Sequence, residues 1–255
     1  MLMTMALLCG AAFLGGALNT IAGGGSFLTL PALAFVGVPL VTANATGAVA
    51  LLPGYLTGAW ALRGGVSSER PLLPLGELVA LAAAGGAAGA ALLATTNDAM
   101  LGRIIPWLML LATVLFLVGP AWMARRTGFG TVPAHAGTPW RTRVVLLAVS
   151  IYGGYFNGGM GILMLALFVL LGQTDLHAMN RSKNLASAVL TLIAVVVYAL
   201  NDAIDWRYAP AMMVAGAIGG WAGGWLARVV PVRYVRAFIV VTGAVMTAIF
   251  FWRSR

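Results

Sequence analysis

The stretch from Ile21 to Pro31, I-A-G-G-G-S-F-L-T-L-P, places three consecutive glycines inside a long apolar run. Each glycine lowers helix stability by about 1 kcal/mol relative to alanine and readily adopts left-handed backbone angles, so the stretch predicts a broken helix. A second break is predicted half a chain later, at residues 156–161, F-N-G-G-M-G. Because freed backbone groups inside a membrane must line a cavity or face other protein, two matched breaks indicate a transport site.

Composition indicates a membrane protein. Hydrophobic residues make up 61% of the 255 residues and charged residues 8%, whereas typical soluble domains have about 25% charged residues. We therefore expect an all-α polytopic membrane protein in one bundle, with the lipid bilayer as a partner. The net charge of +9 would suggest nucleic acid in a soluble protein, but the basic residues cluster in loops, so no nucleic acid is expected. The single Cys9 excludes an internal disulfide, and neither a metal nor a cofactor is expected.

Apolar segments recur in the same order in two halves. The second piece of the first broken segment is too short to cross about 30 Å of hydrocarbon, so a hairpin is favoured, and whether it spans or re-enters is left open. The first half is read as a broken segment at 5–38 and spans at 40–62, 72–94 and 104–123, and the second as a broken segment at 144–172 and spans at 176–200, 209–230 and 235–252. This predicts a first membrane repeat at 1–124, a cytoplasmic linker at 125–142 and a second membrane repeat at 143–255.

The duplication can be checked by sliding the sequence on itself. Matched positions of the two halves are separated by nearly the same number of residues, and loop insertions change this offset by only one residue. Equivalent loops of the two halves differ in charge, which predicts inverted repeats. The loop between the last two spans of the second half is purely basic, with Arg228, Arg233 and Arg236, whereas the equivalent first-half loop, with Asp98 and Arg103, is balanced. The Gly85/Gly89 and Gly219/Gly223 pairs predict close helix packing. The matched positions are Gly23 with Gly158, Gly24 with Gly159, Gly37 with Gly172, Asn44 with Asn180, Thr46 with Ser182, Gly85 with Gly219 and Gly89 with Gly223.

The candidate substrate-binding residues surround the two breaks. A half-helix that starts after a break presents backbone N–H groups and a positive dipole to an anion, and Ser26 is expected to cap the first one. The alternative for the polar side chains is hydrogen bonding between helices. The uncharged candidates are Asn19, Thr20, Gly23, Gly24, Gly25, Ser26, Asn44, Thr46, Asn157, Gly158, Gly159, Gly161, Asn180, Ser182 and Asn184.

Few charged residues fall near the breaks. Lys183, the only lysine, is a candidate for holding an anionic substrate; the alternative, favoured for its neighbour Arg181, is a loop cation on the cytoplasmic side. Glu77 is a candidate for proton coupling, but a glutamate at the membrane interface that reaches water is the favoured alternative. Asp175 is expected to cap the helix that follows it.

Four motifs, two in each half, carry a resemblance to a known family. They are G-G-G-S-F-L-T-L-P at 23–31, A-N-A-T-G-A-V-A-L-L-P-G at 43–54, Y-G-G-Y-F-N-G-G-M-G-I-L-M-L at 152–165 and L-H-A-M-N-R-S-K-N-L at 176–185. With them the sequence resembles the TauE/SafE sulfite exporter family, also called TSUP permeases, over essentially the whole chain. The resemblance implies an inner-membrane permease for sulfur-containing anions such as sulfite, sulfoacetate or other organosulfonates. Two positions depart from the family pattern, because Gly47 stands where Asn is common and Asn157 where a small residue is common.

The predicted function is alternating-access transport of a small anion at the interface of the two repeats. The ATP-binding pattern G-x-x-x-x-G-K-[ST] is absent from the sequence, so secondary transport is expected. The alternatives are an anion channel and a membrane subunit that only docks a partner. An enzyme is not expected, because His135 falls in the linker and His177 at a helix start, away from any nucleophile within a span. Whether the protein forms a homo-oligomer is left open.

Overall fold

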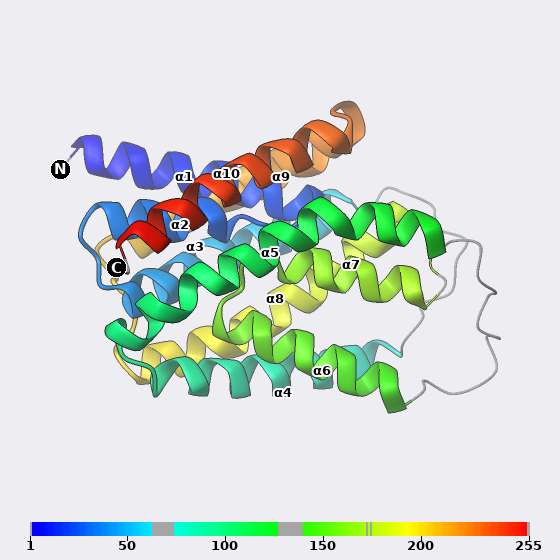
Figure 1. Ribbon diagram of the computed structural model, residues 1–255, viewed down its shortest axis with the longest axis horizontal. Helices are drawn as coiled ribbons and strands as arrows, with labels where there is room; N and C mark the ends of the chain where they lie inside the picture. The colour runs from blue at the N-terminus through cyan, green and yellow to red at the C-terminus, as the bar shows by residue number, and fades with distance from the viewer. Residues whose placement is uncertain (1, 63–73, 127–139, 172, 174, 254–255) are drawn as a thin grey trace.

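The protein is an all-helical bundle (Figure 1), seen in a computed structural model that describes residues 2–62, 74–126, 140–171, 173 and 175–253. This part of the chain contains no strand. The helices are α1 (Leu2–Ile21), α2 (Ser26–Phe35), α3 (Leu40–Ala61), α4 (Leu75–Ala94), α5 (Asp98–Arg126), α6 (Trp140–Tyr155), α7 (Met160–Leu170), α8 (Leu176–Leu200), α9 (Ala209–Val229) and α10 (Val232–Arg253).

Each predicted span corresponds to one helix, and each predicted broken segment forms two helices with a four-residue gap. The ends differ most for the helix predicted at 104–123, which as α5 runs from Asp98 to Arg126. Hydropathy identifies only the part of a helix that lies at lipid depth, whereas helical hydrogen bonding continues beyond that part. At the start of α5 the Asn97 side chain accepts the Met100 N–H at 2.8 Å. Gly172 and residues 127–139 of the predicted linker lie outside the described residues.

Within the described residues, five helices are long and apolar enough to cross a membrane, namely α1, α4, α5, α8 and α10. Helices α3 and α9 are as long, at 22 and 21 residues, but α3 carries several polar residues and α9 is rich in glycine. The first half of helix α3 is enclosed, with every residue from Ala43 to Leu52 buried. A helix surrounded by protein needs no apolar outer face, which explains why its composition gives a weaker membrane signal.

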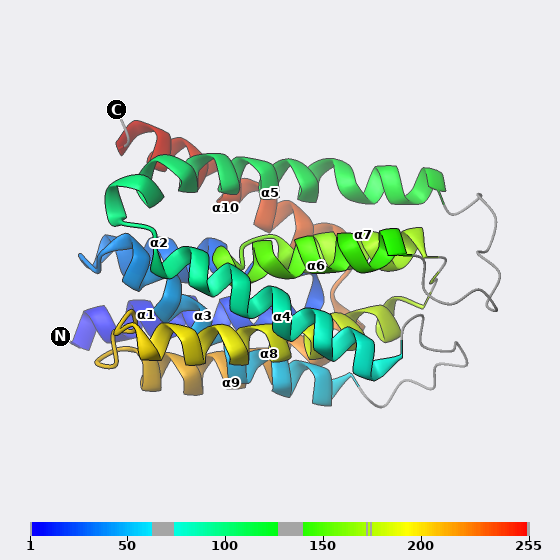
Figure 2. The ribbon, with the colours of Figure 1, turned by 90° about the horizontal axis from the view of Figure 1, so that it is seen from below.

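The two broken segments are hairpins that open toward opposite ends of the bundle (Figures 1 and 2). Helices α1 and α2 leave and return at the end that carries both chain termini. Helices α6 and α7 leave and return at the other end, and the bend of each hairpin lies in the interior of the bundle. The hairpin predicted for the first broken segment is therefore present in both.

Helices of one half of the sequence pack on helices of the other half. Helix α1 packs on α9, and α6 packs on α4. Helix α3 contacts both α8 and α9, α8 contacts α4, and α5 packs along α10. When each helix of a contact in this set is replaced by its equivalent from the other half, the result is again a contact of the set. Neither half therefore forms its own separate core.

Glycines form the closest of these contacts. A Cβ atom added to Gly219 of α9 would overlap the Phe13 carbonyl oxygen of α1, and one added to Gly89 of α4 would overlap the Ile151 carbonyl oxygen of α6. Gly85 meets Ser150 and Gly223 meets Ala17 in the same way. The prediction that these two glycine pairs are packing faces is confirmed, because only residues without a side chain let the backbones approach so closely.

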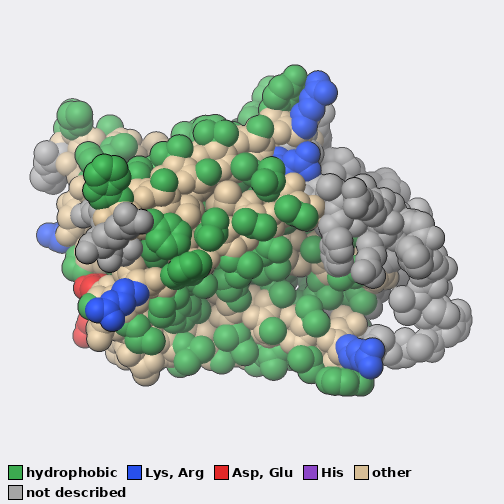
Figure 3. Space-filling model, in the orientation of Figure 1, with side chains coloured by type: hydrophobic (Ala, Val, Ile, Leu, Met, Phe, Trp, Pro, Cys, Tyr) green, Lys and Arg blue, Asp and Glu red, His purple; other side chains and the backbone are tan. Residues whose placement is uncertain are grey.

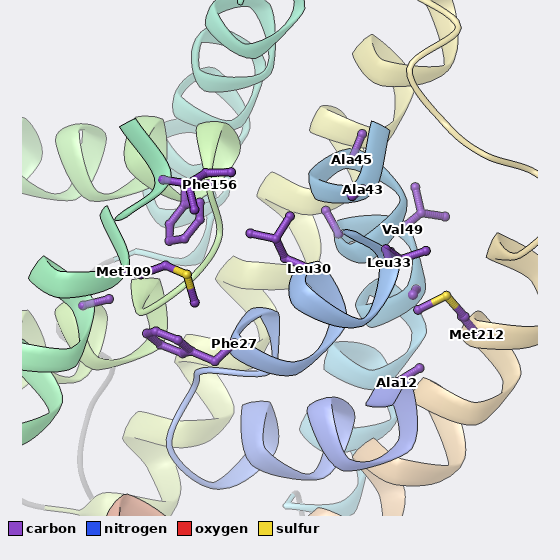
Figure 4. Close-up of a cluster of buried hydrophobic side chains, with 14 of the residues drawn as sticks. Ala12, Phe27, Leu30, Leu33, Ala43, Ala45, Val49, Met109, Phe156 and Met212 are labelled. Atoms are coloured by element: carbon purple, nitrogen blue, oxygen red, sulfur yellow. The ribbon is translucent and has the colours of Figure 1, made fainter. Parts of the chain in front are cut away.

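The largest apolar cluster lies around the short helix α2 (Figure 4). Leu33 of α2 lies beside Val49 of α3, and Phe27 points the other way, toward Met109 of α5. The Phe27 and Phe116 rings stack edge to face, with centroids 6.2 Å apart. These contacts hold the ten-residue α2, which is too short to be stable in isolation.

The outer surface is apolar between two charged ends (Figure 3). Large hydrophobic side chains such as Leu117, Val241 and Trp221 are more than half exposed. On the face shown, lysine, arginine, aspartate and glutamate side chains are confined to the ends of the bundle. An exposed apolar surface of this extent fits contact with lipid, so the chain is a multi-pass membrane protein.

The glycine contacts give a first testable prediction. Replacing Gly219 by Ala should lower the melting temperature of the detergent-purified protein by several degrees, because the added methyl group overlaps the Phe13 carbonyl of α1. Thermal unfolding followed by circular dichroism measures this. Gly76→Ala is the matched control, since a Cβ atom there meets open space and alanine favours a helix. Equal melting temperatures for the two variants would contradict the packing.

Candidate functional site

The two helix breaks touch each other in the interior of the bundle. A Cβ atom built on Gly23 would lie 2.6 Å from the Gly161 Cα atom, and one built on Gly161 would lie 2.7 Å from the Gly23 Cα atom. Any side chain at either position would force the two hairpins apart. The glycines predicted to break the helices therefore also allow the breaks to meet, and we call this meeting point the crossing.

The first break is capped by a side chain from the helix that precedes it. The Asn19 Oδ1 atom accepts the Gly24 N–H at 2.9 Å and the Gly25 N–H at 2.7 Å. Helix α2 then starts at Ser26 with Gly25 as its N-cap residue and no hydrogen bond from a capping side chain there. The prediction that Ser26 caps this helix is wrong, because Asn19 reaches across the break to the N–H groups just before it.

The second break matches the first with a shift of one residue from the alignment predicted above. Helix α1 ends at Ile21 and α6 at Tyr155, so the helix ends align at an offset of 134. Asn157 then takes the place of Gly23, and both have left-handed backbone angles, with φ of 62° and 80°. Asparagine is among the few residues with a side chain that adopt this conformation readily.

Lys183 of α8 binds the end of α1. Its Nζ atom donates to the Asn19 carbonyl oxygen at 2.7 Å and to the Thr20 carbonyl oxygen at 3.4 Å, and also to Asn180 Oδ1 at 2.9 Å. A cation is favoured at a helix C-terminus, where carbonyl groups lack partners within the helix. Lys183 is only 1% exposed, and within the described part of the chain it has no ion-pair partner.

The end of α6 and the break that follows it are bound in a similar way by residues of α3, α8 and α6 itself. The Asn44 side chain of α3 donates to the Tyr155 carbonyl oxygen at 2.7 Å. Tyr198 of α8 donates to the Gly154 carbonyl oxygen, and Tyr152 donates to the Gly158 carbonyl oxygen at 2.6 Å. The carbonyl groups exposed by both breaks are thus satisfied by side chains, as a low-dielectric interior requires.

Three buried amide groups, one beside each break and one on α8, keep hydrogen-bonding capacity. The Nδ2 atoms of Asn19 and Asn157 are buried without a hydrogen-bond partner, and both polar side-chain atoms of Asn184 are buried without one. The Asn157 Oδ1 atom accepts from the Tyr55 hydroxyl at 2.9 Å, which orients its Nδ2 atom. Most buried polar atoms in proteins are paired, so buried donors left unpaired can bind an anion.

Two of the predicted site residues make their contacts elsewhere. The Thr20 hydroxyl donates to the Gly220 carbonyl oxygen of α9 at 3.0 Å, and the Thr46 hydroxyl accepts the Asp205 N–H at 2.9 Å. The hydrogen bonds and charge of Arg207 lower the pKa of the Asp205 carboxyl group in that loop. Ser182 is half-buried on α8, next to the site but without a contact that assigns it a role.

The acidic candidates lie at helix starts. Glu77, in the first turn of α4, forms an ion pair with Arg143 at 2.5 Å, with the Arg143 side chain 52% exposed. This places Glu77 at the end of the bundle, which fits the interfacial alternative. The Asp175 Oδ1 atom accepts the Ala178 N–H at 3.2 Å, so its predicted capping of α8 is confirmed. Among the described residues, no group of three or more His, Cys, Asp or Glu could hold a metal ion.

Sequence reasoning missed three tyrosines of the site, Tyr55, Tyr152 and Tyr198, which are all buried or nearly so. Two of them lie in motifs quoted above or directly beside one, since Tyr152 begins the second-half motif and Tyr55 follows Gly54. A tyrosine buried in a helix bundle needs a hydrogen-bond partner for its hydroxyl group. This requirement is the signal that could have pointed to these tyrosines in the sequence.

Comparison with known proteins shows what the chain is similar to. A family model described as sulfite exporter TauE/SafE matches residues 8–250. The probable membrane transporter protein ORF9 of Sinorhizobium sp is 28% identical over 244 residues, which cover 93% of this chain and 88% of that protein. A probable membrane transporter protein of Haemophilus influenzae is 27% identical over 254 residues, covering 96% and 93%. The probable membrane transporter protein YfcA of Escherichia coli K12 is 25% identical over 246 residues, covering 93% and 86%. No solved structure matches the chain.

The cap at the first break gives the second prediction. Asn19→Ala should lower the melting temperature by several degrees, because the N–H groups of Gly24 and Gly25 lose their acceptor and each unpaired buried group costs about 1–3 kcal/mol. Asn19→Asp keeps an oxygen in the same place and should retain most of the stability. Thermal unfolding of the purified protein distinguishes them. An Ala variant as stable as the wild type, or an Asp variant as damaged as Ala, would contradict the capping role.

Proposed function

We propose, from the premise that the chain belongs to the sulfite exporter TauE/SafE family of membrane transporters, that it is an inner-membrane permease for a small sulfur-containing anion. Sulfite, sulfoacetate and other organosulfonates are the substrates that the family resemblance favours. The observation that carries the proposal is Lys183, a buried cation held only by neutral oxygen atoms.

Burial of a charge without a counter-charge is costly, and the cost falls when an anion binds beside it. The unpaired Nδ2 atoms of Asn19, Asn157 and Asn184 supply further donors from α1, from the second break and from α8. Amide donors and one ammonium group suit a small oxyanion, because they hydrogen-bond its oxygen atoms without a carboxylate that would repel it. The substrate is accordingly proposed to bind between Lys183 and these amides, against the crossing.

We further propose that the two halves are inverted repeats and that transport proceeds by alternating access at their interface. The support is the exchange of packing partners, α1 with α9 against α6 with α4, and the opening of the two hairpins toward opposite ends (Figure 2). A site at the point where both hairpins bend can be reached from either end when one hairpin moves against the other. The crossing of Gly23 and Gly161 is the pivot in this proposal.

The charge of the two ends supports one orientation. By the positive-inside rule, the end where α6 and α10 start faces the cytoplasm, and the end with both termini faces outward. The first end carries Arg141, Arg143, Arg233 and Arg236 with the acids Glu77 and Asp175, and the second carries Asp98, Arg103, Asp202, Asp205 and Arg207. We do not assign proton coupling to Glu77, because its ion pair with Arg143 already explains the presence of a carboxylate at this position.

The function predicts selective flux by the protein alone. Protein reconstituted in liposomes should move sulfite or one of the organosulfonates faster than sulfate, and an outward or inward pH gradient will show whether protons are coupled. Saturation of the rate and its stimulation by substrate on the opposite side identify a carrier, whereas a channel gives neither. Protein that is folded, as judged by its melting temperature, yet moves no anion of the panel would refute the proposed substrate class.

The site residues predict separate effects on flux and on stability. Lys183→Met should reduce the flux of the selected anion at least about tenfold, equivalent to 1.4 kcal/mol or more, through loss of the only buried cation among the described residues. Asn184→Leu should reduce flux without lowering the melting temperature, because no internal hydrogen bond of this side chain is lost.

Arg181→Gln is the matched control, since Arg181 precedes Lys183 by two residues but is exposed. Flux and melting temperature are measured on the same preparations, so a folding defect in Lys183→Met is recognised. If Asn184→Leu transports like the wild type, Asn184 has no part in binding. If Arg181→Gln loses as much flux as Lys183→Met, the general positive charge of α8, and not the buried ammonium group, supports transport.

A further inference from the structure

An apolar groove opens on the outer side of the first hairpin. It has a volume of about 670 Å³ and lies between α1, α2 and α10. Its walls are formed by Gly10 and Leu14 of α1, Leu28 and Pro31 of α2, and Met246 and Ile249 of α10, together with similar apolar neighbours. Leu14 is 48% exposed, so the groove is reached from the outer surface of the bundle. Both α1 and α10 are candidate membrane spans, which places the groove at hydrocarbon depth.

A second, more polar pocket adjoins this groove at the end of the bundle. It has a volume of about 480 Å³ and lies between the α2–α3 turn and the first turns of α5. Ala34 and Phe250 line both cavities, so the two lie side by side. The end pocket holds one acid and one base, Asp98 and Arg103. Asp98 accepts the Val41 N–H at 2.8 Å, and Arg103 is exposed with no ion-pair partner within the described residues.

We propose that the groove and the end pocket together bind one zwitterionic phospholipid of the phosphatidylethanolamine type. Its acyl chain lies in the groove, its phosphate binds Arg103 and its ammonium group binds Asp98. Lipid tails are the only apolar molecules abundant at this depth, and phosphate and ammonium groups are abundant at the level of the helix ends. The pairing of one cation with one anion favours a headgroup that carries both charges over one with phosphate alone.

The bound lipid supports the half-helix that follows the first break. Phe27, Leu28 and Pro31 of α2 line the groove, and α2 starts directly after Gly25. A ten-residue helix depends on its packing neighbours, and on this side the acyl chain completes them. The inference requires only the membrane setting of the chain. It does not depend on which anion, if any, the protein transports.

Gly10 offers a direct way to block the groove. A Cβ atom built on Gly10 has nothing within 4 Å, and Gly10 lines the groove, so Gly10→Leu places a side chain in the groove without a clash at Cβ, and leucine favours the helix. Gly76→Leu is the matched control, because a Cβ atom there also meets open space but lies away from the groove. Delipidated protein is titrated with defined lipids and examined by native mass spectrometry. Gly10→Leu should bind phosphatidylethanolamine at least about tenfold more weakly than the wild type, and Gly76→Leu should bind it equally well.

The headgroup is tested with two further lipids and two further variants. The wild type should prefer phosphatidylethanolamine over phosphatidylglycerol, which lacks the ammonium group, and over a glucosyl diacylglycerol, which lacks the phosphate. Arg103→Gln should remove the preference over the glycolipid. Asp98→Asn should remove the preference over phosphatidylglycerol while keeping the oxygen that accepts the Val41 N–H.

Wild-type binding that is equal for the three lipids, or variants that keep the wild-type preferences, would overturn the headgroup assignment. Gly10→Leu protein that binds phosphatidylethanolamine as tightly as Gly76→Leu would overturn the groove as the acyl-chain site. Because the readout is lipid binding to purified protein, these results are independent of any flux measurement.

Discussion

The structure depends on satisfying the backbone groups that two helix breaks expose inside an apolar bundle. An unsatisfied backbone group costs several kcal/mol where water is absent. Some partners come from the same half, such as Asn19 at the first break and Tyr152 at the second. Others come from the opposite half: Lys183 binds the carbonyl groups at the end of α1, and Asn44 binds the carbonyl group of Tyr155 at the end of α6. Because each half supplies part of what the other lacks, neither break is fully satisfied until the two halves have packed together.

Glycine allows this packing because lipid provides no hydrophobic drive for helices to associate. In a bilayer, contact must come from close van der Waals fit and hydrogen bonds, and both require backbones to approach. The pairs α1 with α9 and α4 with α6 use glycines for this approach, and Gly23 with Gly161 uses them at the crossing. Glycine therefore breaks the helices, lets the two breaks touch and lets the surrounding helices pack closely.

The sequence was sufficient to predict the features that depend on local composition. The breaks follow from glycine runs and the spans from hydropathy, so both were found with errors of a few residues at the helix ends. Contacts between residues far apart in the chain could not be predicted from the sequence. Ser26 was the local choice of cap, yet Asn19 does the capping from the preceding helix, and Thr46 binds the backbone of Asp205 in a loop 159 residues later. Lys183 was singled out because it is the only lysine, but its partners on α1 could not be read from any pattern.

Binding of an anion at this site is linked to helix packing by the hydrogen bonds of Lys183. The same ammonium group that is proposed to hold the substrate also holds the carbonyl groups of Asn19 and Thr20. An anion that draws Nζ toward itself weakens the contact between α8 and α1, and a conformation that separates these helices frees Nζ for the anion. Each process therefore changes the equilibrium of the other by the same free energy. Linkage of this kind is what alternating access requires, since the substrate must favour a rearrangement of the helices that enclose it.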